Sequence, residues 1–242
     1  MLHRLPPLPA LSGGWKQLKF DFASRAVEII LPGEPDHLLD DPEVIAANQR
    51  DDYMPYWSYL WPAAAPFARA LGSAPWPRGV EVLDIGSGIG LSGLALLARG
   101  DRVVFTDYDP QSLLLCRHNA VRNGFDDPET LMLDWRSPID RQFRIITGCE
   151  VTYEQRNHEP IVKLLHKMLA PTPLGEFQSV AWIADPGRYH AHGFVELARS
   201  SGFDVTILDE QLRSHVSPRS NEFQIMQLTR EQKPGFGDSG AS

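Results

Sequence analysis

The chain has 242 residues, and its 23 basic and 31 acidic side chains give a net charge of −8 at pH 7. This surplus of acid argues against a general grip on nucleic acid, which needs Lys and Arg gathered along one face. A hydrophobic content of 43% with 22% charged residues is typical of a soluble globular protein, and the length suits one α/β domain.

The cysteine content and the hydropathy pattern indicate where in the cell the protein is expected. Cys116 and Cys149 are the only cysteines, so the sequence has no disulfide framework, and it has no CxxC or Cys/His cluster typical of a metal site. No run approaches the ~20 apolar residues that span a bilayer. The Pro-rich start, residues 1–14, lacks the apolar run of a signal peptide. We therefore expect a cytoplasmic protein with no metal and no membrane or nucleic-acid partner.

The distribution of Pro, Gly and Ser divides the chain. Residues 1–15 and 233–242 are rich in these types, which predicts flexible tails. Between them we expect a single domain over residues 16–232. Its parts are an N-terminal extension and lid over 16–78 and a cofactor-binding core over 79–232.

The N-terminal extension contains three recognisable segments. Residues 17–31 alternate in a way that predicts two short strands around a turn at 23–25. A helix is expected from near Pro62, because proline suits the first helical turn. The acidic run between them, 34–52, is expected to be a solvated loop; alternatively, it steers a basic substrate protein.

Strands and helices alternate from Gly79 onward, which indicates βαβ units and a mainly parallel sheet. The last two strands are joined by a loop too short for a parallel crossover, so they should pair antiparallel. We therefore predict an α/β fold: a Rossmann-like, seven-strand sheet with an antiparallel C-terminal hairpin and helices on both faces. The expected strands are 80–85, 102–107, 130–135, 143–149, 179–185, 204–210 and 222–230, and the expected core helices are 91–99, 110–124, 158–170 and 190–202.

The sharpest motif is Asp84-Ile85-Gly86-Ser87-Gly88-Ile89-Gly90, directly after the first core strand. Glycines at this position let the backbone turn tightly and approach a ligand. In the register D-x-G-x-G-x-G the motif resembles motif I of class I methyltransferases, whose loop wraps the methionine part of S-adenosylmethionine. A second register, residues 88–93, reads G-x-G-x-x-G, the dinucleotide pattern, but it starts two residues after the turn has begun. The position of the glycines thus favours S-adenosylmethionine over NAD.

Two acidic residues lie at the ends of the next two expected strands. Asp107 lies 21 positions after Gly86, where an acid can accept hydrogen bonds from ribose hydroxyls. Asp134 and Trp135 end the third strand, and the indole offers a flat apolar face for a base. The alternatives are a solvated aspartate and a core tryptophan.

The sequence resembles the seven-strand lysine methyltransferases (family 16). Four segments carry the resemblance: the tryptophan-centred Pro55-Tyr-Trp57-Ser-Tyr-Leu-Trp61-Pro62, the glycine motif, Asp134-Trp135, and Cys149-Glu150-Val-Thr-Tyr153 after the fourth strand. The Pro-Tyr-Trp doublet and Asp185-Pro-Gly-Arg188 further resemble the enzymes that methylate the β subunit of electron transfer flavoprotein. The similarity covers about residues 53 to 230.

The resemblance implies S-adenosyl-L-methionine as cofactor and a protein with an accessible lysine as substrate, such as the β subunit of electron transfer flavoprotein. It implies that Glu150 and Tyr153 are catalytic and that Asp185 and Arg188 bind substrate. Glu150 stands where the family has Asp, and a displacement of about 1 Å affects reaction rates strongly. We therefore interpret Glu150 as an acceptor that orients the amine, and Tyr153 as part of the channel wall. The cofactor residues implied are Trp61, Asp84, Gly86, Ser87, Gly88, Gly90, Asp107, Asp134, Trp135 and Cys149.

Other functions share parts of this pattern. A small-molecule N-methyltransferase differs only in its substrate pocket, and a non-catalytic module that kept the cofactor fold is compatible with glutamate at position 150. A nucleic-acid adenine methyltransferase needs D-P-P-Y or N-P-P-Y to stack a flipped base, and residues 149–153 lack these prolines. An NAD oxidoreductase is disfavoured by the glycine register.

Overall fold

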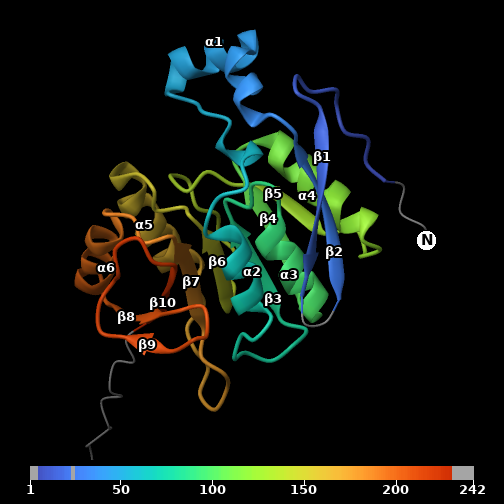
Figure 1. The fold of residues 1–242 in the computed structure, drawn as a ribbon. Coiled ribbons are helices and arrows are strands. Elements are labelled where there is room, and N and C mark those ends of the chain that lie inside the picture. Colours follow the sequence, from blue (N-terminus) through green and yellow to red (C-terminus); the bar gives the residue numbers. More distant parts are fainter. Residues whose placement is uncertain (1–4, 23–24, 231–242) are drawn as a thin grey trace, which may run out of the picture.

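The computed structural model describes residues 5–22 and 25–230, and an eight-strand sheet forms its centre (Figure 1). The strand order is β5-β4-β3-β6-β7-β10-β8-β9. The first four pairs in this order are parallel, and β10 runs antiparallel to both β7 and β8. The predicted fold is confirmed, with a two-residue strand, β9, added at one edge. The strands are β3 (Glu81–Ile85), β4 (Arg102–Asp107), β5 (Glu129–Met132), β6 (Ile145–Cys149), β7 (Val180–Asp185), β8 (Phe203–Leu208), β9 (Ser214–His215) and β10 (Gln224–Arg230).

Helices cover both faces of the sheet. Because side chains alternate along a strand, Val82 packs with one apolar cluster while Leu83 and Ile85 pack with the other. The first cluster takes in α2, α3 and α4, and the second takes in α5 and α6. The helices are α2 (Ala64–Leu71), α3 (Leu91–Arg99), α4 (Pro110–Arg122), α5 (His158–Met168) and α6 (Ala191–Ser200).

The N-terminal strands form a separate two-strand sheet beside α4. β1 (Trp15–Asp21) pairs antiparallel with β2 (Ala26–Pro32), which confirms the expected hairpin. Most of its expected turn, residues 23–24, lies outside the described residues. Asn119 of α4 joins this hairpin to the core. Its Oδ1 accepts from the Ile30 amide at 2.8 Å, and its Nδ2 donates to the Ile30 carbonyl at 2.9 Å.

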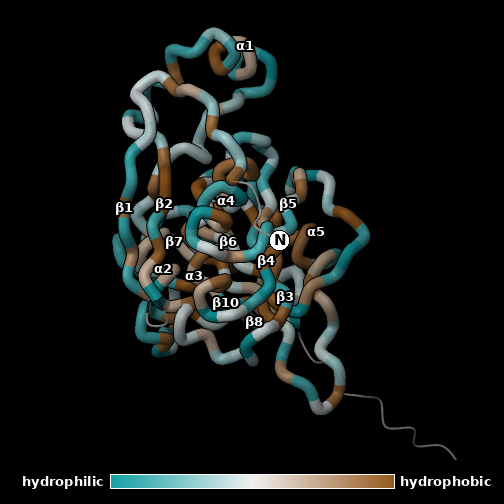
Figure 2. Tube along the Cα trace, turned by 90° about the vertical axis from the view of Figure 1, so that its right-hand side faces the viewer, coloured by the Kyte–Doolittle hydropathy of each residue, from teal (hydrophilic) through white to brown (hydrophobic). Residues whose placement is uncertain are grey.

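The acidic run from 34 to 52 is helical, where a loop was expected. It forms the 3-10 helix η1 (Pro35–Asp40) and helix α1 (Pro42–Asp51), which Asp41 caps by accepting from the Glu43 amide at 2.8 Å. No residue of α1 is buried, and both views show it projecting from the body (Figures 1 and 2). An Asx cap followed by proline is a preferred helix start, and it marks where α1 begins.

The segment before β1 is better anchored than a free tail. Residues 5–14 form no helix or strand, yet Leu8 and Leu11 pack against the core, and Nδ1 of His118 lies 2.7 Å from the Pro6 carbonyl oxygen. The tail expected at 233–242 lies outside the described residues. Within the described part of the chain, no helix is long and apolar enough to cross a membrane.

Candidate active site

The loop after β3 turns three times through the left-handed region, at Gly86 (φ 61°), Gly88 (φ 53°) and Gly90 (φ 84°). Side chains other than glycine rarely adopt this conformation. Ser87 fastens the loop to the sheet, because its Oγ donates to the Asp84 carbonyl at 3.0 Å and accepts from the Thr106 amide at 3.1 Å. The glycine motif therefore lies at the carboxyl end of the parallel strands, where open α/β sheets bind ligands.

Asp107 is the last residue of β4 and is fixed by three hydrogen bonds. Its Oδ2 accepts from the Gly88 amide at 3.0 Å and from Oγ of Ser112 at 2.9 Å, and its Oδ1 accepts from the Asp109 amide at 3.0 Å. Burial raises its pKa to about 6. Since a carboxylate offers about four acceptor positions, one remains for a ligand hydroxyl.

Asp84 lies in β3 just before the loop, and Gly90 is the last glycine of the loop. Neither lines the pocket described below, although both were expected to contact cofactor. Asp84 is 1% exposed, its Oδ1 accepts from Oγ1 of Thr147 at 2.8 Å, and burial raises its pKa to about 7. Gly90 packs against Cys116, whose Sγ is 3.0 Å from the position of an added Cβ. Their position fits a role in supporting the loop.

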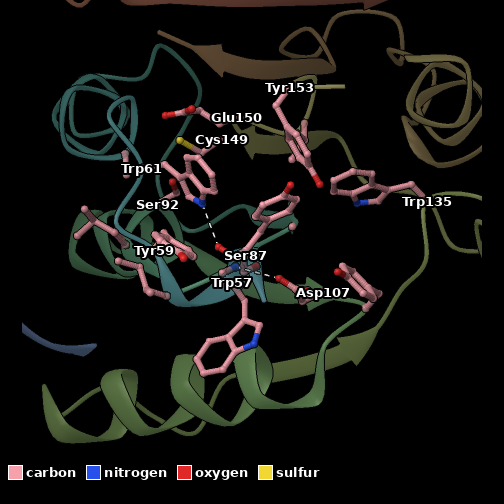
Figure 3. Close-up of a pocket in the computed structure, with 18 residues that line it drawn as sticks. Trp57, Tyr59, Trp61, Ser87, Ser92, Asp107, Trp135, Cys149, Glu150 and Tyr153 are labelled. Atoms are coloured by element: carbon pink, nitrogen blue, oxygen red, sulfur yellow. Dashed lines mark hydrogen bonds between the residues drawn. The ribbon is translucent and has the colours of Figure 1, made fainter. Parts of the chain in front are cut away.

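The predicted residues Trp61, Asp107, Trp135, Glu150 and Tyr153 line one pocket together with the glycine loop (Figure 3). It encloses about 670 Å³, including space open to solvent. In Figure 3, Glu150 and Cys149 lie at one end and Asp107 at the other. Of the predicted residues, those that line it are Trp61, Gly86, Ser87, Gly88, Asp107, Trp135, Cys149, Glu150 and Tyr153.

Aromatic side chains form one wall of the pocket. The Trp61 and Tyr153 rings are nearly parallel, 13° apart, with centroids 6.5 Å apart, and Tyr56 meets Tyr153 edge-on at 5.2 Å. Nε1 of Trp61 donates to the Tyr56 carbonyl at 3.0 Å. Of these three aromatic residues, sequence reasoning singled out Trp61 and Tyr153 but not Tyr56, although the run of aromatics in residues 56–61 was the available signal. The lining residues it missed include Tyr56, Trp57, Tyr59, Ser92 and Tyr108.

Asp134 lines an adjoining pocket that shares Trp135 and Tyr153 with the first. Its carboxylate is engaged by Arg136, whose Nη2 lies 2.7 Å from Oδ2. The guanidinium beside it holds the pKa of that carboxyl below its usual range. This pairing leaves Trp135 as the better placed of the two for an adenine ring.

Glu150 has an unusual backbone conformation for a non-glycine residue, with φ 54°. Its amide donates to the Ala184 carbonyl at 2.8 Å, and its side chain is 1% exposed. Oε1 accepts from the Ala63 amide at 2.6 Å, and Oε2 accepts from Nη2 of Arg188. Strain of this kind is retained at functional sites when the surroundings hold it in place.

The two residues predicted to bind substrate have different surroundings. Asp185 is fully buried, and its Oδ1 accepts from the amides of Gly187 and Arg188, both at 2.7 Å. It builds the turn after β7 and lines none of the described pockets. Arg188 reaches the site through Glu150, and its guanidinium carbon lies 5.6 Å from the centroid of the Trp61 ring.

The residues present fit S-adenosylmethionine. A Cβ on Gly86 would meet Trp135, so glycine at this position lets the loop and the indole pack together. Asp107 supplies an acceptor for a hydroxyl, and Trp135 supplies an apolar face. Within residues 5–22 and 25–230, no group of three or more His, Cys, Asp or Glu side chains is placed to hold a metal ion.

Known proteins resemble the chain in sequence and in fold. The pattern of the family described as lysine methyltransferase matches residues 59–178. The electron transfer flavoprotein β subunit lysine methyltransferase of Mus musculus is 28% identical over 143 residues, covering 55% of this chain and 51% of that protein. The ribosomal protein L11 methyltransferase of Photobacterium profundum is 33% identical over 90 residues, covering 37% of this chain and 31% of that protein. The chain thus spans about half or less of these relatives.

Solved structures show the same fold. A TehB-like S-adenosylmethionine-dependent methyltransferase from Corynebacterium glutamicum superposes with a TM-score of 0.57 at 21% identity, covering 82% of this chain and all of that one. A glycopeptide N-methyltransferase complexed with S-adenosylmethionine gives a TM-score of 0.53 at 12% identity, covering 70% and 94%. The family match over residues 59–178 favours the S-adenosylmethionine register of the glycine motif over the dinucleotide register. Over residues 59–178 the chain matches the pattern of the lysine methyltransferase family, and the solved structures show that it has the fold of S-adenosylmethionine-dependent methyltransferases.

Proposed function

We propose that this protein transfers methyl groups from S-adenosylmethionine to a lysine side chain of a protein substrate. The observation that carries the proposal is that the glycine loop and the pair Glu150 and Tyr153 line the same pocket. The family match and the protein-methylating relatives support it.

The cofactor would lie along the carboxyl end of the sheet. Asp107 would accept from a ribose hydroxyl, Trp135 would lie against the adenine, and the backbone from Gly86 to Gly88 would face the methionine part. When bound, this cofactor supplies a methyl group on a positively charged sulfur. We propose Cys149 and Trp61 as neighbours of that end of the cofactor, since both line the pocket there.

The residues of the chain must deliver a neutral amine. Lysine has an ordinary pKa near 10.4, so only about one in a thousand is neutral at pH 7. The aromatic side chains of Tyr56, Trp61 and Tyr153 exclude water, and desolvation favours the uncharged form. Burial raises the pKa of Tyr153 to about 12, so its hydroxyl stays protonated at neutral pH. Tyr153 would line the channel and Glu150 would orient the amine, so that alignment supplies much of the rate.

The first candidate substrate is the β subunit of electron transfer flavoprotein, because that relative matches the greater part of the chain, 55% against 37% for the L11 enzyme. Ribosomal protein L11 is the second. The acidic segment that forms η1 and α1 fits a basic partner surface. Two free cysteines fit a reducing compartment, and we propose the cytoplasm.

The test is transfer of a labelled methyl group to each of these two proteins, purified, and to the small-molecule fraction of a lysate. Wild-type enzyme should label protein, and Glu150→Ala should lose transfer while it retains cofactor binding. Label confined to small molecules would support a small-molecule N-methyltransferase. Cofactor binding with no transfer to any acceptor would support a non-catalytic module.

A further inference from the structure

The carboxylate of Glu150 caps a helix that is distant in sequence. Helix α2 has no side-chain cap of its own, and Ala63 at its N-cap position already has helical dihedrals. The amide of Ala63 donates to Oε1 of Glu150 at 2.6 Å. Free amides and the partial positive charge at a helix start favour a carboxylate at this place. Glu150 therefore links the loop after β6 to the start of α2.

The turn after β7 aims Arg188 at the same carboxylate. Asp185 accepts from the Arg188 amide, and Gly187 (φ 88°) has no room for a side chain, since an added Cβ would lie 2.4 Å from the Glu222 amide nitrogen. The guanidinium donates to Oε2 of Glu150 and lies over the ring of Trp61. Three segments of the chain thus meet at one buried carboxylate.

We propose that Arg188 is a positioning residue for methyl transfer, which clamps Glu150 against the start of α2 and thereby fixes the Trp61 side of the pocket. This inference rests on the proposed function. We call the contacts of Glu150 with Arg188 and with the Ala63 amide the clamp. The extra methylene of glutamate, compared with aspartate, fits the clamp, because the side chain spans from the loop after β6 to the start of α2.

The clamp also determines the charge that a lysine would meet. Glu150 is compensated by Arg188 on one side and by a helix start on the other, so it does not hold an incoming ammonium in its charged form. Among the residues that the structure describes, Arg188 is the only one that forms an ion pair with Glu150. The other titratable groups that line the same pocket are Tyr56 and Tyr59 before α2, Cys149 and Tyr153 on either side of Glu150 in its loop, Tyr108 after β4, and Asp107 at the opposite end of the pocket (Figure 3). Asp185 lies beneath the turn after β7.

Removal of the guanidinium would leave the carboxylate facing the amine. A nearby negative charge raises the pKa of an ammonium, commonly by a unit or more. The pH at which methyl transfer reaches half its maximal rate should then increase by about one unit in Arg188→Met and stay near the wild-type value in Arg188→Lys.

The deciding measurement is hydrogen exchange of the Ala63 amide in the free protein. In Arg188→Met we expect exchange about 10- to 100-fold faster, the effect of weakening one hydrogen bond to a charged group. Arg188→Lys should exchange close to wild type. The matched control is Arg213→Met, which removes an arginine from another ion pair, with Asp209, and should leave this amide unchanged.

Unchanged exchange in Arg188→Met, or equal acceleration in the Arg213 control, would overturn the clamp. A uniform loss of transfer with no change in its pH dependence would overturn the charge effect. If wild type methylates neither candidate protein, the proposed function fails, while the exchange measurement still decides the clamp.

Discussion

A Cβ added to Gly86 would lie 2.8 Å from Cζ2 of Trp135 and 3.0 Å from Cγ1 of Val151. The indole therefore occupies the space that the absent side chain leaves beside the loop. The glycine turn after β3 and the tryptophan after β5 form one structural unit, which ties the two expected ends of the cofactor together.

Gly86→Ala should displace this indole and lower the affinity for S-adenosylhomocysteine by about tenfold or more, because overpacking of this kind costs about 1–3 kcal/mol. Calorimetric titration measures it. Gly124→Ala is the matched control, since Gly124 has a similar positive φ of 75° and no atom within 4 Å of an added Cβ. Equal losses in both variants would mean that backbone strain alone matters.

Cofactor affinity should depend on the ionisation of Asp107. Its pKa is raised to about 6 by burial, so the carboxylate that accepts a ribose hydroxyl is lost as the pH falls through this value. We expect affinity to weaken below about pH 6 in the wild type. In Asp107→Asn it should be lower by about 10- to 100-fold at pH 8 and nearly independent of pH. If the affinity of the wild type does not change between pH 5 and pH 8, Asp107 does not contact the cofactor.

Asp84 should make folding stability fall as the pH rises. Its folded-state pKa is raised by burial from 3.8 to about 7, so between these values the folded state binds a proton that the unfolded state has lost. The contribution of Asp84 to folding stability is therefore largest below about pH 4, and it decreases as the pH rises to about 7. Asn at this position can still accept from Thr147. Thermal melts should show a smaller decrease from pH 5 to pH 8 in Asp84→Asn, and parallel curves would contradict the prediction.

Asn119 should stabilise the N-terminal hairpin strongly. It is fully buried, and besides both bonds to Ile30 it donates to the Ile89 carbonyl in the glycine loop at 3.3 Å. Asn119→Ala should cost about 2–4 kcal/mol, because several buried backbone groups lose partners. Asn123 bonds the backbone of Glu28 in the same manner but is only half-buried, so Asn123→Ala should cost less. Denaturant unfolding compares the two, and equal losses would contradict this.

The periodicity of the sequence predicted the strands and their order of appearance, because parallel strands buried on both faces give short apolar runs. Helix α1 was missed. Its sequence PEVIAANQRD has no apolar stripe, and none of its residues is buried, so only the Asp41 and Pro42 start signal marks it. Hydrophobic periodicity does not detect a helix that has no core face.

The site was predictable where backbone geometry dictates the residue type and less so where partners come from distant segments. Glycines at 86 and 88 and the acid at 107 follow from a turn and an acceptor position at a sheet edge. The cap that Glu150 gives to Ala63 joins residues 87 positions apart, and no local pattern indicates it. Asp185 was expected at the substrate because it follows a strand, whereas its burial depends on the turn that it builds.

Lysine methylation is tested most directly by mass spectrometry of the β subunit of electron transfer flavoprotein and of ribosomal protein L11 after incubation with wild-type enzyme and isotopically labelled S-adenosylmethionine. The predicted result is labelled methyl on lysine side chains of one of these proteins, absent with Glu150→Ala and abolished when the modified lysine is changed to arginine. Labelled methyl on another residue type, or only on small molecules, would contradict the proposed function.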